Sequence, residues 1–73
     1  MLRLGEEQRK LLQAFMRRQG LEQTHLADRC QMSNDTISKV LAGASVRLRT
    51  VERVRDILSI PAHLFYKPDL MQL

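Results

Sequence analysis

The segment that decides the fold spans residues 23–43 and reads QTHLADRCQMSNDTISKVLAG. Its apolar residues recur at helical spacing, because Leu26 and Cys30 lie four residues apart with Ala27 beside them. This pattern predicts a short helix over residues 23–30. The small Ala27 side chain would allow a second helix to cross this one closely.

A second helix is predicted to begin after Ser33, whose hydroxyl can accept a backbone N–H two or three residues later. Ile37, Val40 and Leu41 would form its inner face, and Gly43 would end it. The outer face carries short polar or charged side chains, namely Asn34, Asp35, Ser38 and Lys39. This pair of helices has the pattern of a helix-turn-helix, in which the first helix crosses the DNA backbone and the second lies in the major groove.

Helical spacing recurs on both sides of this segment, and no stretch shows sustained strand-like alternation. A helix over residues 6–19 is predicted to stop at Gly20. A further helix over residues 48–58 has five apolar positions that we expect to be buried: Leu48, Val51, Val54, Ile57 and Leu58. Pro61 is placed to occupy the first position of a last short helix, with Leu64 and Phe65 facing inward.

The length of 73 residues fits one domain. We expect an all-α, compact bundle of about five short helices, with its core over residues 6–66 and an irregular tail over residues 67–73. The single cysteine, Cys30, excludes an intrachain disulfide. A signal peptide is not apparent, nor is an apolar run of about 18 residues, so we expect a cytoplasmic protein without a membrane partner.

The positive charge of the chain is concentrated in one window. The formal net charge is +4 at pH 7, and residues 36–55 hold five basic side chains against the single acid Glu52. The basic residues are Lys39, Arg47, Arg49, Arg53 and Arg55. A localised basic field attracts polyanions, of which nucleic acid is the commonest, although a solvated basic helical face would have the same composition.

Residues 23–43 resemble the core of the Xre, or lambda-repressor-like, helix-turn-helix family. The shared pattern is a Gln that opens the first helix of the pair, then Leu-Ala, a Ser at the start of the next helix, an Ile four residues later and a closing Gly. The resemblance continues through LRTV at 48–51 and LSIP at 58–61. The family usually has Gly where this chain has Gln31, and a left-handed conformation there would cost on the order of 1 kcal/mol.

The resemblance implies a bacterial or phage protein that binds double-stranded DNA. The positions that match the family's base-reading residues are Asn34, Asp35, Ser38 and Lys39. Lys can donate to guanine, Asn can pair with adenine, and Asp can accept from cytosine. The positions expected to contact the DNA backbone are Gln23, Ser33, Thr36, Arg47 and Arg49.

We expect a dimeric transcriptional repressor, because palindromic DNA sites are matched by two-fold protein dimers. The expected dimer interface is the apolar C-terminal group Leu64, Phe65, Tyr66, Leu70 and Met71. The alternative for this group is that it covers the core of the monomer. Two other functions keep the same fold: an antitoxin whose main partner is a toxin protein, and a protein-interaction module that has lost DNA binding. RNA polymerase is a further candidate partner.

Other chemistry has little support in the sequence. His25 and His63 lack neighbours at metal-ligand spacing, so no metal site is expected. Cys30 is expected to be a core residue rather than a nucleophile paired with His25. There is no Gly-rich phosphate loop and no acid–base constellation. We therefore expect no cofactor, no small-molecule ligand and no enzymatic activity.

Overall fold

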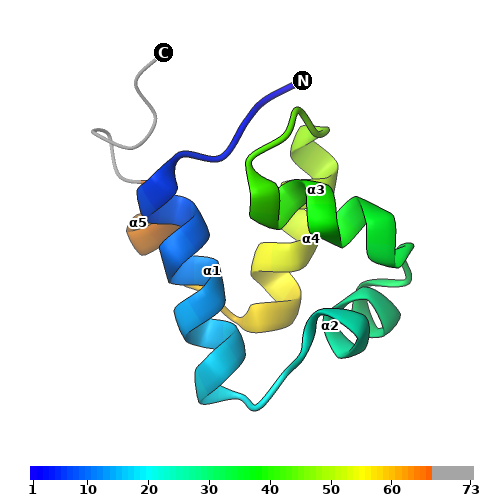
Figure 1. The fold of residues 1–73 in the computed structure, drawn as a ribbon. Helices are drawn as coiled ribbons and strands as arrows, with labels where there is room; N and C mark the ends of the chain where they lie inside the picture. Colours follow the sequence, from blue (N-terminus) through cyan, green and yellow to red (C-terminus); the bar gives the residue numbers. More distant parts are fainter. Residues whose placement is uncertain (67–73) are drawn as a thin grey trace.

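The computed structural model describes residues 1–66 of the chain. These residues form five helices: α1 (Glu6–Arg18), α2 (Gln23–Cys30), α3 (Asn34–Ala42), α4 (Leu48–Leu58) and α5 (Ala62–Phe65). Figure 1 shows α1 and α5 on one side of the molecule and α2 and α3 on the other, with α4 between them. The predicted all-α bundle is confirmed: α1 to α4 begin and end within one residue of their predicted positions, and α5 begins one residue later than predicted.

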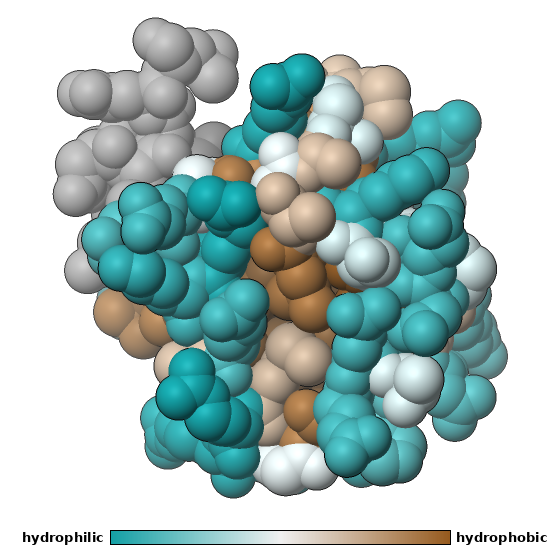
Figure 2. Space-filling view, in the orientation of Figure 1, coloured by the Kyte–Doolittle hydropathy of each residue, from teal (hydrophilic) through white to brown (hydrophobic). Residues whose placement is uncertain are grey.

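The core is built from the inward faces of all five helices. Its most deeply buried large side chains are Leu12, Leu26, Ile37, Val40, Val51, Val54, Leu58, Ile60 and Phe65. Full burial of such a side chain is worth roughly 1.5–3 kcal/mol, so these contacts dominate the stability of so small a domain. Figure 2 shows that some apolar surface remains visible as a strip between the hydrophilic flanks formed by α1 and by α2 and α3.

The ends of four helices are also held by side chains from other elements. A helix leaves its last carbonyl groups without partners inside the helix, so a donor from elsewhere can both satisfy them and fix the helix in place. The donor–acceptor pairs are Arg53–Cys30 on α2, Arg9–Ala42 on α3, Gln19–Leu58 on α4 and Gln8–Phe65 on α5, with N···O distances of 3.2, 3.0, 2.7 and 3.0 Å. Polar contacts therefore help to set the positions of α2 and α3.

Gly43 ends α3 as the sequence predicts. Its φ of 79° lies in the left-handed region that favours glycine. Its site is also crowded, because a Cβ atom there would lie 2.6 Å from Nη1 of Arg9. The same guanidinium donates to the Ala42 carbonyl, so the absence of a side chain at Gly43 leaves room for the α1–α3 contact.

The residues before α1 form an extended segment that the sequence reading missed. The Leu2 N–H donates to the Val46 carbonyl and the Val46 N–H donates to the Leu2 carbonyl, both at 2.8 Å. Along this segment exposed Met1 and Arg3 alternate with half-buried Leu2 and buried Leu4. The segment therefore lies against the loop between α3 and α4, as Figure 1 shows.

Three residues of the predicted helices differ from expectation: Leu48, Pro61 and Ile57, of which the last is half-buried instead of buried. Leu48 is predicted to be buried, but its side chain is 50% exposed. It belongs to the first turn of α4, at the end of the helix that lies away from α1 (Figure 1). Pro61 precedes α5 as its N-cap instead of occupying its first position, because its ψ of 137° is extended.

The prediction of Phe65 as an interface residue requires correction. Phe65 is 0% exposed, and its ring packs edge-on against Tyr66 with 5.1 Å between the ring centroids. Its side chain fills the core and presents no surface to a partner. Leu64 and Tyr66 are half-buried and stay candidates for an interface, whereas Leu70 and Met71 lie outside the described residues.

Candidate nucleic-acid interface

The turn between α2 and α3 determines how α3 is presented. Gln31 ends α2 in the left-handed conformation, with φ 57° and ψ 43°. The next N–H, of Met32, donates to the Ala27 carbonyl at 3.0 Å, which closes the hydrogen-bond pattern of a Schellman turn. Gln31 therefore adopts the left-handed conformation that glycine adopts with less strain. This strain costs on the order of 1 kcal/mol.

Arg53 of α4 supports this turn from behind. Its Nε donates to the Cys30 carbonyl at 3.2 Å, and its Nη2 donates to Oε1 of Gln31 at 3.4 Å. Cys30 is buried, and burial raises the pKa of its thiol from the ordinary value of 9.0, although the charge of Arg53 lowers it. The thiol is therefore protonated at neutral pH, and Cys30 is the core residue that the sequence predicts.

These contacts predict how the turn responds to substitution. Arg53→Met is expected to lower the free energy of unfolding by about 1–2 kcal/mol, because the end of α2 loses a charged hydrogen bond. Gln31→Gly is expected to raise it by up to about 1 kcal/mol, since the left-handed strain is relieved. Denaturant unfolding of the single variants and the double variant measures both effects. Gln31→Gly should stabilise the Arg53→Met protein more than it stabilises the wild-type protein, because the Gln31–Arg53 hydrogen bond is already lost in Arg53→Met. If Arg53→Met is as stable as the wild-type protein, the contact of Arg53 with the turn contributes nothing to stability.

The start of α3 is held by two sets of hydrogen bonds. Oγ of Ser33 accepts from the Thr36 N–H at 3.1 Å, which confirms Ser33 as the N-cap. Nε2 of Gln23, at the start of α2, donates to the carbonyl oxygen of Asn34 at 3.3 Å and to its Oδ1 at 3.1 Å. These bonds use oxygen atoms of Asn34 and leave its side-chain NH₂ group outside them. The structure thus joins the N-termini of the two helices through two of the predicted site residues.

The outer face of α3 carries the four predicted base-reading residues, and all four are exposed: Asn34, Asp35, Ser38 and Lys39. On the opposite face, Ile37 and Val40 are 0% and 1% exposed and fix the helix against the core. Nζ of Lys39 lies 3.5 Å from Oδ2 of Asp35, with both side chains more than half exposed. Such surface pairs contribute about 0–1 kcal/mol, so Lys39 could exchange Asp35 for a base at little cost.

Two recesses flank the start of α4. The first, of about 420 Å³, is lined by Cys30, Gln31, Met32, Arg47, Arg49, Thr50 and Arg53. The second, of about 340 Å³, is called the α3–α4 recess below and is lined by Met1, Thr36, Lys39, Ser45, Val46, Arg47 and Thr50. Arg47 and Thr50 belong to both. The α3–α4 recess therefore brings Thr36 and Lys39 of the predicted site together with Arg47.

The four arginines of the basic window divide into two groups. Arg53 binds the α2–α3 turn, and Arg55 donates to the Ile60 carbonyl and pairs with Asp56 at 3.0 Å. By contrast, the side chains of Arg47 and Arg49 make no hydrogen bond or ion pair within residues 1–66. Of the four, only these two are exposed and without a partner within residues 1–66, so they remain the candidates for contacts to the DNA backbone.

Ser45 and Thr50 are candidate site residues that the sequence reading missed. Together with Thr36 they place three hydroxyl groups around the α3–α4 recess, beside the cations of Lys39 and Arg47. Hydroxyl and cationic side chains are among the groups that bind DNA phosphates. The sequence does show several hydroxyl residues on both sides of the basic loop that holds Arg47. It does not show which of these hydroxyl residues line the same recess.

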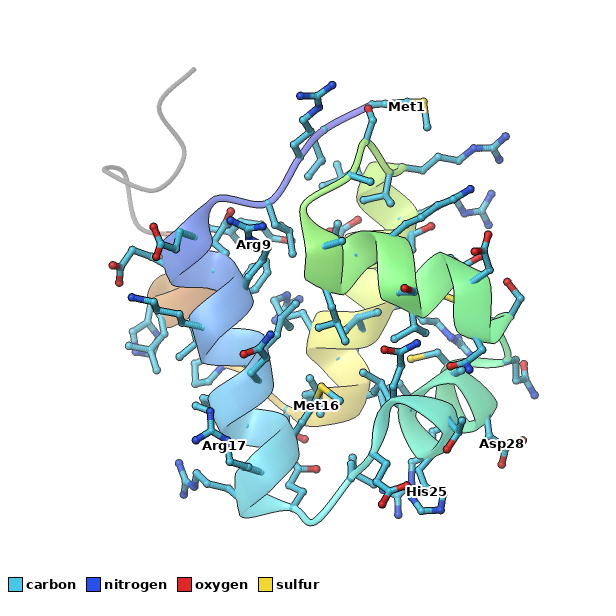
Figure 3. The ribbon with its side chains drawn as sticks, in the orientation of Figure 1. Met1, Arg9, Met16, Arg17, His25 and Asp28 are labelled. Atoms are coloured by element: carbon cyan, nitrogen blue, oxygen red, sulfur yellow. The ribbon has the colours of Figure 1, made fainter. Side chains whose placement is uncertain are left out.

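The described part of the chain, residues 1–66, meets the requirements of neither a metal site nor a membrane-spanning helix. Residues 1–66 contain no group of three or more His, Cys, Asp or Glu side chains placed to hold a metal ion. His25 lies on α2, at the opposite end of the molecule from Met1 and the α3–α4 recess (Figure 3). None of the described helices is both long enough and apolar enough to cross a bilayer.

Comparison with known protein families gives one match. A family model described as a helix-turn-helix domain matches residues 9–65, which include all five helices except the first three residues of α1. No curated protein and no solved structure matches the chain.

Proposed function

Because the chain belongs to the helix-turn-helix domain family, we propose that it is a sequence-specific regulator of transcription, a dimeric repressor at a palindromic operator. The observation that carries this proposal is the outer face of α3, where four exposed polar side chains stand on a helix that the core fixes from behind. The neighbouring start of α4 adds Arg47 and Arg49, whose side chains are exposed and make no hydrogen bond or ion pair within residues 1–66. A polar face beside local positive charge is what binding in the major groove requires.

Sequence recognition is assigned to α3. With α3 in the major groove, Lys39 would donate to guanine and the NH₂ group of Asn34 would donate to an acceptor on a base edge. Asp35 would accept from cytosine, or else keep its pair with Lys39 and orient that ammonium group. Ser38 lies on the same exposed face and can bond to several bases.

Backbone binding is assigned to the two ends of this face. Gln23 sits at the start of α2, where the N-terminus of the helix favours an anion. Arg47 and Arg49 lie at the start of α4. Thr36 lines the α3–α4 recess, and Ser33 is the N-cap of α3. Contacts to phosphates would fix the register of α3 on the duplex without contributing sequence preference.

A dimer would place two α3 helices in successive major grooves on one side of the duplex. Leu64 and Tyr66 are the described residues that we assign to the interface, with Leu70 and Met71 of the tail as further candidates. Bound to an operator in the cytoplasm of a bacterial cell, such a dimer would repress transcription by excluding RNA polymerase.

Selection of bound sequences from random duplex DNA tests the proposal. We expect a palindrome whose half-sites are about 10–10.5 base pairs apart, centre to centre, because each protomer of a two-fold dimer reads one half-site. A matched selection with a protein that carries both Asn34→Ala and Lys39→Ala serves as the control and should lose enrichment at the affected positions. Failure of the wild-type protein to enrich any sequence would contradict the repressor and favour a protein-interaction module.

A further inference from the structure

We propose that residues Met1–Arg3 form an arm of the DNA-binding surface, with the Arg3 guanidinium bound to a backbone phosphate at the edge of the groove that α3 occupies. This inference rests on the proposed function, and it adds a contact from a segment outside the helix-turn-helix. The ligand is the phosphate backbone of duplex DNA.

The first step is that the arm has a fixed position. The two hydrogen bonds between Leu2 and Val46, both at 2.8 Å, pair the segment with the loop that leads from α3 into α4. Leu2 is half-buried and Leu4 is 4% exposed, so their side chains anchor the segment on the core. An arm held at its middle and at its base is ordered before DNA arrives, which lowers the entropic cost of using it.

The second step is the direction in which the arm presents its side chains. Successive residues of an extended segment point to opposite sides, so Met1 and Arg3 share the side opposite to Leu2 and Leu4. The Met1 side chain lines the α3–α4 recess, and Figure 3 shows it at the end of the molecule where that loop lies. Arg3 is exposed on the same side of the segment, about 6–7 Å further along it.

The third step concerns charge. Lys39 and Arg47 line the recess whose wall Met1 completes, and Arg3 extends this group of cations along the arm. Arg3 makes no side-chain hydrogen bond or ion pair within residues 1–66, although Glu6 and Glu7 follow it closely. Glu6 pairs instead with Lys10 at 3.5 Å. The Arg3 charge is therefore available to an external anion.

A phosphate is the expected partner of Arg3 because the arm lies beside α3 and not on its outer face. Base edges face α3, whereas the groups at the rim of the groove are phosphates and sugars. Loss of Arg3 should therefore weaken binding to every duplex by a similar factor and reduce the dependence of binding on salt.

The central experiment compares Arg3→Ala with Arg17→Ala by fluorescence anisotropy over a series of salt concentrations. Arg17 is an exposed arginine in the last turn of α1, at the other end of the molecule from Met1 (Figure 3), so both variants lose one positive charge. Arg3→Ala should bind selected and random-sequence duplexes about three- to tenfold more weakly, with the log–log salt slope reduced by about 0.9 per protomer. Arg17→Ala should change the affinity much less, and Arg3→Lys should keep most of it.

A second variant tests whether the Leu2–Val46 pairing positions the arm. Leu2→Pro removes the N–H that donates to Val46, so it should weaken DNA binding about as much as Arg3→Ala does. In the Leu2→Pro protein, Arg3→Ala should have little further effect, because the arm is already displaced. Equal affinities of Arg3→Ala and Arg17→Ala, or a loss confined to the selected duplex, would overturn the inference. Absence of binding by the wild-type protein would instead refute the proposed function.

Discussion

Replacing Lys39 with alanine is expected to weaken binding to the selected duplex by about 1–3 kcal/mol while binding to a scrambled duplex changes far less. The Lys39 side chain stands on the exposed face of α3, opposite Ile37 and Val40, which the core buries almost completely. In the proposed complex it therefore points at base edges. Asn34→Ala should have a similar effect at a different base position.

The chain provides a matched control for this measurement. Lys10 pairs with Glu6 at 3.5 Å on α1, in the same i,i+4 geometry and at similar exposure as Lys39 with Asp35 on α3. Lys10→Ala thus removes the same charge and the same kind of surface pair at a place assigned no DNA contact. It should leave the ratio of the two affinities unchanged.

Arg47→Ala and Arg49→Ala should behave differently from the α3 variants. Both should weaken binding to selected and scrambled duplexes by similar factors and reduce the salt slope, because phosphates carry no sequence information directly. Competition binding of the four variants against both duplexes separates the two classes. If Lys39→Ala lowers both affinities by the same factor, α3 does not read the sequence and the assignment of roles is wrong.

The helices could be predicted because their signals are local. Ser33, Gly43 and the apolar residues at helical spacing each act within a few positions of the chain, and the structure places the helix ends where these signals predict. The exposure of Leu48 could not be predicted in this way. A helical pattern shows which face is apolar, but not how far along the helix the rest of the core extends.

The parts of the site that escaped prediction depend on contacts between distant residues. Nothing in the basic window distinguishes Arg53 from Arg49, yet Arg53 binds the α2–α3 turn and Arg49 makes no such contact. The pairing of Leu2 with Val46 joins residues 44 positions apart. Residues 1–4, Met-Leu-Arg-Leu, contain a single polar side chain and show no strand-like alternation, so the sequence gives no local signal for this extended segment.

The exposed face of α3 was the most predictable part of the site. A residue that is polar and lies opposite an apolar stripe is exposed in almost any packing of the helix. The Gln23–Asn34 bonds were less accessible to prediction, because they require the relative position of α2 and α3, which the turn at Gln31 and its contact with Arg53 determine.

The largest loss of stability is expected for Phe65→Ala, at about 3–5 kcal/mol. Phe65 is the largest of the fully buried side chains, and its carbonyl accepts a hydrogen bond from Nε2 of Gln8, which ties α5 to α1. Small domains are stable by only about 5–15 kcal/mol, so this variant would be partly unfolded at moderate temperature. Thermal melting and denaturant unfolding measure the loss, with Leu64→Ala as the half-buried neighbour that should cost much less.

The difference in burial between Phe65 and Leu64 determines which variant can test the dimer interface. A variant of Phe65 that fails to associate would show only that the monomer has lost its core. Leu64→Asp places a charge on a half-buried position next to it and should weaken self-association in sedimentation while most of the melting temperature is retained. If Leu64→Asp and a protein lacking residues 67–73 both dimerise like the wild type, the interface lies elsewhere. If Phe65→Ala unfolds no more easily than Leu64→Ala, α5 does not contribute to the core as the structure indicates.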